Sequence, residues 1–102
     1  MDSALNAIAE PRRREILALI ARSELSAGEI AGNFDVTRPA ISQHLAVLRS
    51  AGLVSERRAG TRRFYRARRE GLAGLREWLD GFWRDGLATL RTEAEREAKR
   101  GR

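Results

Sequence analysis

The residues with the clearest chemistry in this sequence are arginines that lie close together between Arg57 and Arg69. Seven arginines occur in this segment without a single carboxylate. Residues 1–69 carry 13 basic and seven acidic side chains, whereas residues 70–102 carry seven of each, so the net charge of +6 arises entirely in the first part. A concentrated basic block favours a polyanionic partner. The alternative is a solvated arginine-rich surface without a partner.

Catalytic and metal-binding chemistry have few candidates. The sequence has no cysteine, which excludes disulfides, thiolate metal ligands and cysteine nucleophiles. His44 is the only histidine. A metal site needs several ligands, so we expect neither a metal nor another cofactor. No acid–base pair and no nucleophile with a neighbouring base is evident, so the sequence does not predict an enzyme. The 102 residues fit a single domain, 1–102, too small to enclose a large active-site pocket.

Two capped segments position the polar residues of the central part of the chain. Ser26-Ala27-Gly28-Glu29 is a capping box, which predicts the start of a short helix. Thr37 can cap the next helix, and Pro39 fits the first turn of that helix. Two helices joined by a turn of about three residues predict a helix-turn-helix over residues 26–51. Repressors with this motif place the second helix in the major groove of DNA.

The second of these helices has an apolar face, made by Ile41, Leu45 and Leu48, and a polar face. On the polar face, glutamine can pair with adenine, serine accepts several bases, and arginine can bind guanine or phosphate. The expected DNA contacts of this helix are Thr37, Arg38, Pro39, Ser42, Gln43, His44 and Arg49. An ordinary solvated face is the alternative for this group, and a half-buried structural role is the alternative for His44.

A basic hairpin follows at once. Residues 53–58 and 62–67 have the character of two strands around Ala59-Gly60-Thr61, where the glycine supplies the positive φ that a tight turn needs. A helix-turn-helix followed by a basic hairpin is the winged form of the motif, with the wing at residues 53–67. Neighbouring strand residues face opposite sides, so only some of the arginines can face DNA. We expect these to enter the minor groove or neutralise phosphates; the candidates are Arg57, Arg58, Arg62 and Arg63.

The last third, residues 70–98, is predicted to be one long helix because its apolar residues follow a 3.6-residue period. It would span roughly 40 Å, which is longer than a small body can cover. Gly74, Gly81 and Gly86 each cost about 1 kcal/mol in a helix interior, which favours a close helix approach or a bend. We expect this helix to form a dimer contact, and core packing within one subunit is the alternative. The expected contact residues are Leu75, Trp78, Leu79, Phe82, Trp83 and Leu90.

Several segments resemble the ArsR family of winged helix-turn-helix repressors. The stretch from Ala7 to Leu17 is similar to the N-terminal segment of these proteins. The stretch from Ser26 to Ala31 is similar to the first helix of their DNA-binding helix-turn-helix motif. The segments Arg38–Val54 and Arg62–Arg66 resemble the recognition helix and the return strand of the wing. Glu70 to Trp83 is similar to the last helix of the metal-independent members. The resemblance covers most of the chain, with the motifs in the family's order.

The resemblance implies a homodimer in which the first and last helices pair across a two-fold axis, which adds Leu5 and Ile8 to the expected dimer contact. It also implies repression from an operator with two inverted half-sites. Many members sense a metal through cysteines at the start of the reading motif, or through carboxylates and histidines on the last helix. Residues 25–30 contain no cysteine and the last helix contains no histidine, so we expect no metal response through these sites. The sequence does not indicate which effector, if any, the protein responds to.

The expected fold is therefore mostly α-helical with a small β-hairpin wing, and the expected function is sequence-specific binding of double-stranded DNA. A non-specific architectural DNA-binding protein is the alternative, because it needs the basic excess but not the polar face with Ser42 and Gln43. A winged domain for protein or lipid contacts would usually lack so basic a wing. The sequence has no apolar stretch of membrane-spanning length and no secretory signal, so we expect no membrane contact and a cytoplasmic location.

Overall fold

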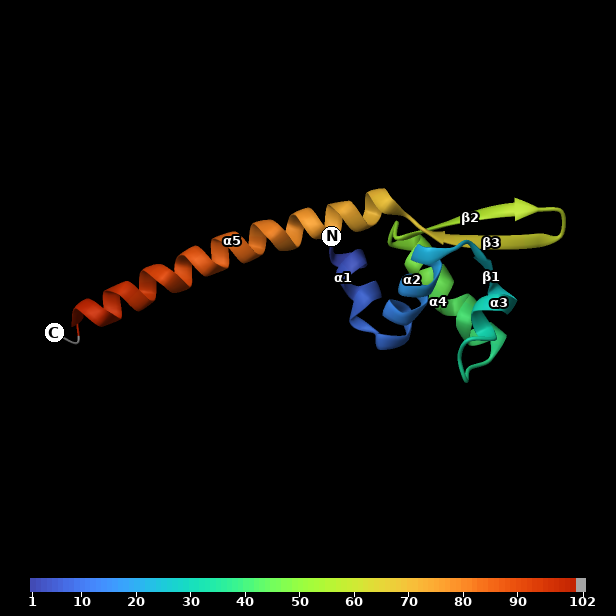
Figure 1. Ribbon diagram of the computed structural model, residues 1–102, viewed down its shortest axis with the longest axis horizontal. Coiled ribbons are helices and arrows are strands. Elements are labelled where there is room, and N and C mark those ends of the chain that lie inside the picture. Colours follow the sequence, from blue (N-terminus) through green and yellow to red (C-terminus); the bar gives the residue numbers. More distant parts are fainter. Residues whose placement is uncertain (101–102) are drawn as a thin grey trace.

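The computed structural model describes residues 1–100 of the chain, with side chains described up to Lys99. A small body is formed by the helices α1 to α4 and the sheet, and α5 projects from it (Figure 1). The elements in chain order are α1 (Asp2–Ala9), α2 (Pro11–Arg22), β1 (Leu25–Ser26), α3 (Ala27–Ala31), α4 (Arg38–Ser50), β2 (Val54–Ala59), β3 (Arg62–Ala67) and α5 (Arg69–Arg100).

The chain turns between α1 and α2 at Glu10, whose backbone is extended and whose side chain accepts a hydrogen bond from Arg13 N at 3.0 Å. The side chains of Arg13 and Arg14 reach back to the end of α1. Arg13 Nε donates to Ala7 O at 2.6 Å, and Arg14 Nη1 donates to Ile8 O at 2.7 Å. The last carbonyls of a helix lack partners within the helix and favour a cation. The two arginines therefore fix α1 against α2.

The two helices of the helix-turn-helix begin at the predicted caps. Ser26 Oγ accepts a hydrogen bond from Glu29 N at 3.2 Å, and Glu29 Oε1 accepts one from Ser26 N at 3.0 Å, which completes the capping box of α3. Thr37 Oγ1 accepts a hydrogen bond from Ala40 N at 3.3 Å at the start of α4. These caps satisfy backbone donors that have no partner within the helix.

The sheet is antiparallel with the strand order β1-β3-β2. β2 and β3 form the predicted hairpin, and Gly60 in its turn has a φ of 63°. β2 begins and ends one residue later than expected. The sequence analysis did not predict β1, which is only two residues long and pairs Leu25 with Tyr65. This strand fastens the wing to the start of α3.

The core lies between α1, α2, α3, α4 and the base of the sheet. Its largest fully buried side chains are Ile16, Ile20, Ile30, Ile41, Leu45, Leu48 and Leu53. α5 adds only Leu75 to this buried set, with Leu72 packed against it. The rest of α5 extends beyond the body, and the molecule measures 71 × 27 × 21 Å. None of the helices among residues 1–100 combines the length and the apolarity that crossing a membrane requires.

A close backbone contact fixes the start of α5. A Cβ atom on Gly71 would lie 2.0 Å from the carbonyl oxygen of Gly52, the residue that leaves α4 with a φ of 77°. Apart from the neighbouring backbone of α5 itself, no atom of the described residues lies within 4 Å of where a Cβ atom would stand on Gly74, Gly81 or Gly86. The expected close approach at those three glycines is therefore absent within one chain, and the glycine that packs closely is Gly71.

Candidate nucleic-acid interface

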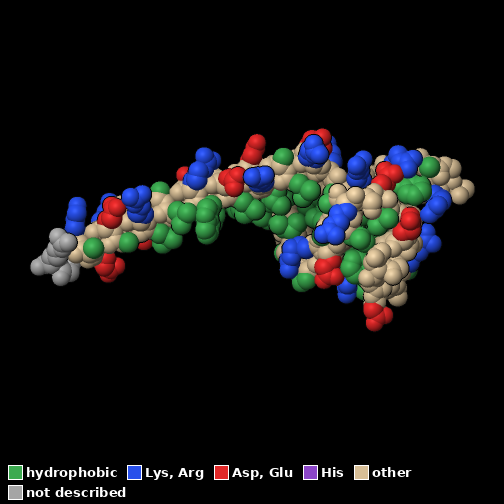
Figure 2. All heavy atoms as spheres, viewed as in Figure 1, with side chains coloured by type: hydrophobic (Ala, Val, Ile, Leu, Met, Phe, Trp, Pro, Cys, Tyr) green, Lys and Arg blue, Asp and Glu red, His purple; other side chains and the backbone are tan. Residues whose placement is uncertain are grey.

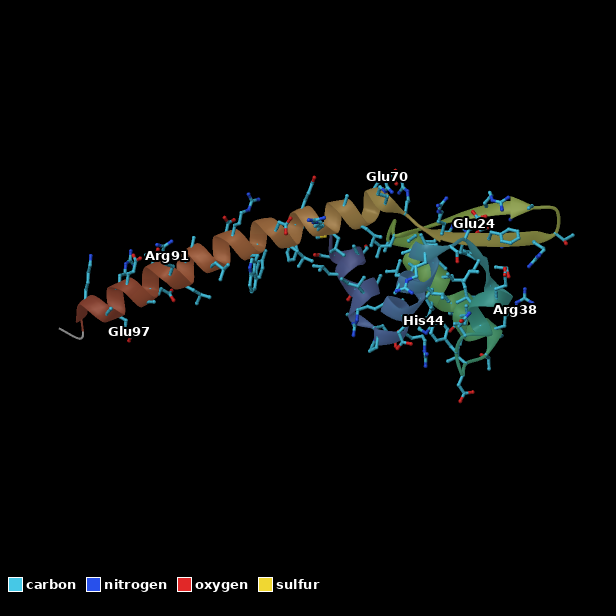
Figure 3. All side chains as sticks on the ribbon, viewed as in Figure 1. Glu24, Arg38, His44, Glu70, Arg91 and Glu97 are labelled. Atoms are coloured by element: carbon cyan, nitrogen blue, oxygen red, sulfur yellow. The ribbon has the colours of Figure 1, made fainter. Side chains whose placement is uncertain are left out.

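The polar face of α4 is exposed along the whole helix. Its apolar residues Ile41, Leu45 and Leu48 are buried, which turns the opposite side to solvent. Figure 3 shows Arg38 at the end of the body that is remote from α5. Among the DNA contacts predicted for this helix, the exposed ones are Thr37, Arg38, Pro39, Ser42, Gln43 and Arg49. These residues form the recognition face.

A groove lies between the N-terminal half of α4 and the tip of the wing. It has a volume of about 610 Å³. The predicted contact residues Arg38 and Ser42 line one side, and Arg62 and Arg63 line the other. The start of α3 contributes Gly28 and the carboxylate of Glu29, which lies 3.6 Å from Arg62 Nη2. Guanidinium and hydroxyl donors are the groups that commonly bind phosphate oxygens, so the groove suits a nucleic-acid backbone.

The wing arginines are divided between two faces of the hairpin. Arg57 pairs with Phe64 across the strands, and the guanidinium groups of Arg57 and Arg62 each lie 5.0 Å from the centre of the Phe64 ring. Arg58 and Arg63 form the next cross-strand pair, on the other face. The four arginines are thus divided between two faces of the hairpin, and which of them face DNA stays a prediction.

Arg57 is held by a carboxylate from outside the wing. Arg57 Nη2 donates to Glu24 Oε1 at 2.6 Å, and Arg57 Nε donates to the same oxygen at 3.0 Å. This hydrogen bonding lowers the pKa of Glu24 below its ordinary value and raises the pKa of Arg57. The two groups are therefore charged at neutral pH and bind each other.

Glu56 lies among three arginines, which we call the Glu56 cluster: Glu56, Arg49, Arg58 and Arg63. Arg49 Nη1 donates to Glu56 Oε2. Glu56 Oε1 lies 3.6 Å from Arg58 Nε and 3.5 Å from Arg63 Nε. The Glu56 side chain is only 10% exposed. Sequence reasoning missed this residue, although alternation along β2 places it on the same face as Arg58.

His44 differs from the other members of the predicted contact set. Its side chain is 23% exposed, and its Nδ1 atom lies 4.0 Å from Glu10 Oε2, at the turn between α1 and α2. The structure therefore places it beside the recognition face, as in the alternative of a half-buried residue. Across residues 1–100, no group of three or more His, Cys, Asp or Glu side chains is arranged to hold a metal ion.

Comparison with known proteins gives matches along most of the chain. Residues 10–56 match the model of the bacterial regulatory protein, arsR family. The chain is 49% identical over 86 residues to the HTH-type transcriptional regulator Rv2034 of Mycobacterium tuberculosis, covering 84% of this chain and 80% of that protein. The chain belongs to the ArsR family.

Two further relatives of this ArsR-family chain bear on its assembly and activity. The transcriptional repressor SdpR of Bacillus subtilis is 34% identical over 86 residues, with 84% of this chain and 96% of that protein covered. The homodimeric winged helix-turn-helix DNA-binding domain of a possible ArsR-family regulator from Mycobacterium bovis has a solved structure. Its TM-score to this chain is 0.67 at 33% identity, with 82% of this chain and 78% of that chain covered.

The ArsR-family chain leaves one face of α5 apolar and exposed. Figure 2 shows hydrophobic side chains along the side of α5 that is turned toward the body. Phe82 and Trp83 are 61% and 64% exposed. The exposed apolar face consists of Trp78, Leu79, Phe82, Trp83, Leu87 and Leu90.

Three of the residues predicted for the dimer contact also pack within their own chain. Leu75 is buried in the core of its own chain, at 7% exposure, so it packs within the subunit as in the alternative. Leu5 and Ile8 are half-buried on α1 and pack against the same core. Each of them retains some exposed surface beside the start of α5.

Proposed function

We propose that this ArsR-family protein is a repressor that binds double-stranded DNA as a homodimer. The observation that carries the proposal is the groove between α4 and the wing. It brings Arg38, Ser42, Arg62 and Arg63 together beside the exposed polar face of α4. A helix that carries base-reading side chains next to guanidinium groups for the backbone is what a sequence-specific DNA reader needs.

In this proposal α4 lies in the major groove, where Ser42 and Gln43 contact base edges. Arg38 and Thr37 bind phosphates or a guanine at one end of the helix, with Pro39 against the DNA beside them. The wing tip, with Arg62 and Arg63, lies over the adjacent minor groove. Each of the four wing arginines, and Arg49, already lies against a carboxylate: Glu24 for Arg57, Glu29 for Arg62, and Glu56 for Arg49, Arg58 and Arg63. A DNA contact by any of them therefore requires an exchange of partners.

The proposed dimer pairs the exposed apolar face of α5 with α5 and α1 of a second copy. The homodimeric relative supports this arrangement. Large aromatic side chains such as Phe82 and Trp83 are typical anchors of interfaces. A two-fold dimer binds two inverted half-sites whose centres are separated by about one helical turn or a multiple of it.

The proposal includes repression in the cytoplasm without a metal effector at the usual family positions. The sequence has no cysteine, and its single histidine lies on α4, which supports the absence of a metal effector at those positions. The similarity to a protein named as a transcriptional repressor supports repression. A non-specific architectural DNA-binding protein stays the alternative.

Selection of bound duplexes from a random DNA pool near physiological salt tests the function. We expect two inverted half-sites to be enriched. Retained duplexes without an enriched motif would favour the architectural alternative, and failure to retain any duplex would contradict DNA binding. Placing the enriched site upstream of a reporter gene then separates repression from activation, because expression should fall when the protein is produced.

A further inference from the structure

The Glu56 cluster joins three arginines to one carboxylate, and the proposed readout gives no role to that carboxylate. It joins Arg49 at the end of α4, Arg58 on β2 and Arg63 on β3 through one carboxylate. Because that carboxylate is 10% exposed, it has limited access to water, and the arginines are its main polar partners.

The cluster lies beside the groove that the proposed function assigns to DNA. Arg63 lines that groove and also lies 3.5 Å from Glu56. Arg49 ends the exposed polar face of α4. A carboxylate and a phosphate diester bind guanidinium groups with the same chemistry, charge-assisted hydrogen bonds from N–H donors. An arginine that is bound to Glu56 is therefore not available to a DNA phosphate.

We propose that Glu56 is an internal competitor of DNA phosphates that limits the affinity of the protein for every duplex. In the free protein it holds Arg49, Arg58 and Arg63. On DNA, each arginine that moves to a phosphate leaves a poorly solvated carboxylate with one partner fewer, which opposes the transfer. This inference rests on the proposed function.

Removal of the carboxylate charge should release the three arginines. Glu56→Gln keeps the shape of the side chain and its acceptor oxygen but removes the negative charge. Three guanidinium groups would then repel one another, and DNA phosphates would relieve that repulsion. The change therefore favours binding, and each additional phosphate contact steepens the dependence of log K on log salt concentration by about 0.9.

The experiment compares wild type, Glu56→Gln and Glu77→Gln on the selected operator and on an unrelated duplex, over a series of salt concentrations. Glu77 is exposed on α5 and remote from the wing, so its variant carries the same change of net charge. We expect Glu56→Gln to bind both duplexes at least about threefold more tightly at low salt, with a salt slope steeper by about 0.9 to 2.7. Glu77→Gln should match wild type.

The possible results separate the inference from the function. Circular dichroism must show that Glu56→Gln is folded like wild type. Weaker binding of the folded variant at an unchanged salt slope would mean that Glu56 only holds the wing in place, which overturns the proposal. Unchanged affinity and slope would also overturn it. If wild type binds no duplex, the proposed function fails and the inference fails with it.

Discussion

Gln43 is in the middle of the exposed face of α4, and its side chain makes no hydrogen bond with the described part of the chain. Replacement by alanine should relax the base preference at one position of each half-site, because a glutamine–adenine pair contributes about 1–3 kcal/mol of discrimination. Selection from a random pool would measure the preference matrix. Ser50→Ala, exposed near the end of the same helix, is the control and should leave the matrix unchanged. An unaltered matrix for Gln43→Ala would remove this residue from the readout.

Ser26 fixes the start of α3 through both halves of the capping box. Ser26→Ala should cost about 1 kcal/mol of stability, which urea unfolding at neutral pH would measure. The backbone N–H of Ser26 and, to a smaller extent, its side chain lower the pKa of Glu29 by hydrogen bonding, and Ser26→Ala removes only the side-chain part. A depressed carboxyl pKa stabilises the fold above the ordinary pKa, and that contribution is lost as the pH falls through the folded value. The difference in unfolding free energy between wild type and Ser26→Ala should therefore become smaller below about pH 4. A difference that is independent of pH would contradict the coupling between Ser26 and the charge of Glu29.

At the scale of residues, the sequence predicted the exposed face of α4 because helical periodicity separates it from Ile41, Leu45 and Leu48. It did not predict the carboxylates that bind the arginines. Glu24 is 33 residues before Arg57, and the two meet only because β1 pairs with β3. Residue counts along a segment measure its charge but do not show which charges the fold neutralises.

The start of α5 depends on a glycine at position 71. Gly71→Ala would place a Cβ atom 2.0 Å from the Gly52 carbonyl oxygen, so the backbone must shift. We expect a loss of about 1–3 kcal/mol, as for other overpacked sites. Gly74→Ala is the matched control, because its Cβ would have no neighbour within 4 Å of the same chain and helix propensity favours alanine by up to about 1 kcal/mol. Thermal unfolding of both variants would measure their stabilities. Equal melting temperatures would contradict a role of the Gly52–Gly71 contact in stability.

The wing acts as one basic element. Replacement of Arg62 and Arg63 together by alanine should weaken binding to every duplex. The salt slope should flatten by about 0.9 if Arg62 alone contacts a phosphate, and by about 1.8 if Arg63 also leaves Glu56 for one. Titration of labelled duplexes at several salt concentrations would measure both effects. The double variant Arg91→Ala with Arg96→Ala, on the far part of α5, removes the same charge as a control. Affinity and slope equal to wild type would remove the wing tip from the interface.

Element boundaries were predictable where caps and periodicity agree. The capping box and Thr37 locate the starts of α3 and α4, and the apolar period of the last third predicts α5 almost to its observed ends. β1 was not predictable, because two residues carry no alternation pattern and the strand depends on its partner β3. Arg13 and Arg14 also escaped interpretation, since their partners are backbone carbonyls of another helix.

At the scale of the molecule, the exposed apolar face of α5 predicts the assembly state. Replacing both Phe82 and Trp83 by glutamate should convert the dimer into a monomer, because charged groups would be buried in the interface. Sedimentation analysis would measure the mass, and operator affinity should fall because only one half-site is then bound. Glu77→Gln, on the opposite side of α5, should stay dimeric. A dimer of unchanged stability would contradict the use of this face.

The elongated shape was predictable in part. The segment with apolar residues at helical spacing is long enough to form a helix that extends beyond the body, and the molecule is indeed 71 Å long. A periodicity argument, however, does not distinguish a residue buried in its own subunit from one buried by a partner. Leu75 and Trp83 follow the same period, yet the first is 7% and the second 64% exposed. Only the position of the body along α5 separates them.

The contact between Gly52 and Gly71 fixes the direction in which α5 leaves the body. The part of α5 beyond this contact is about 44 Å long, so a change of about 10° in its direction there moves the far end by about 8 Å. If the far parts of two such helices are joined, the angle at each contact sets the distance and phase between the two recognition helices. The backbone contact between these two glycines would thereby set which operator spacing such a dimer can span.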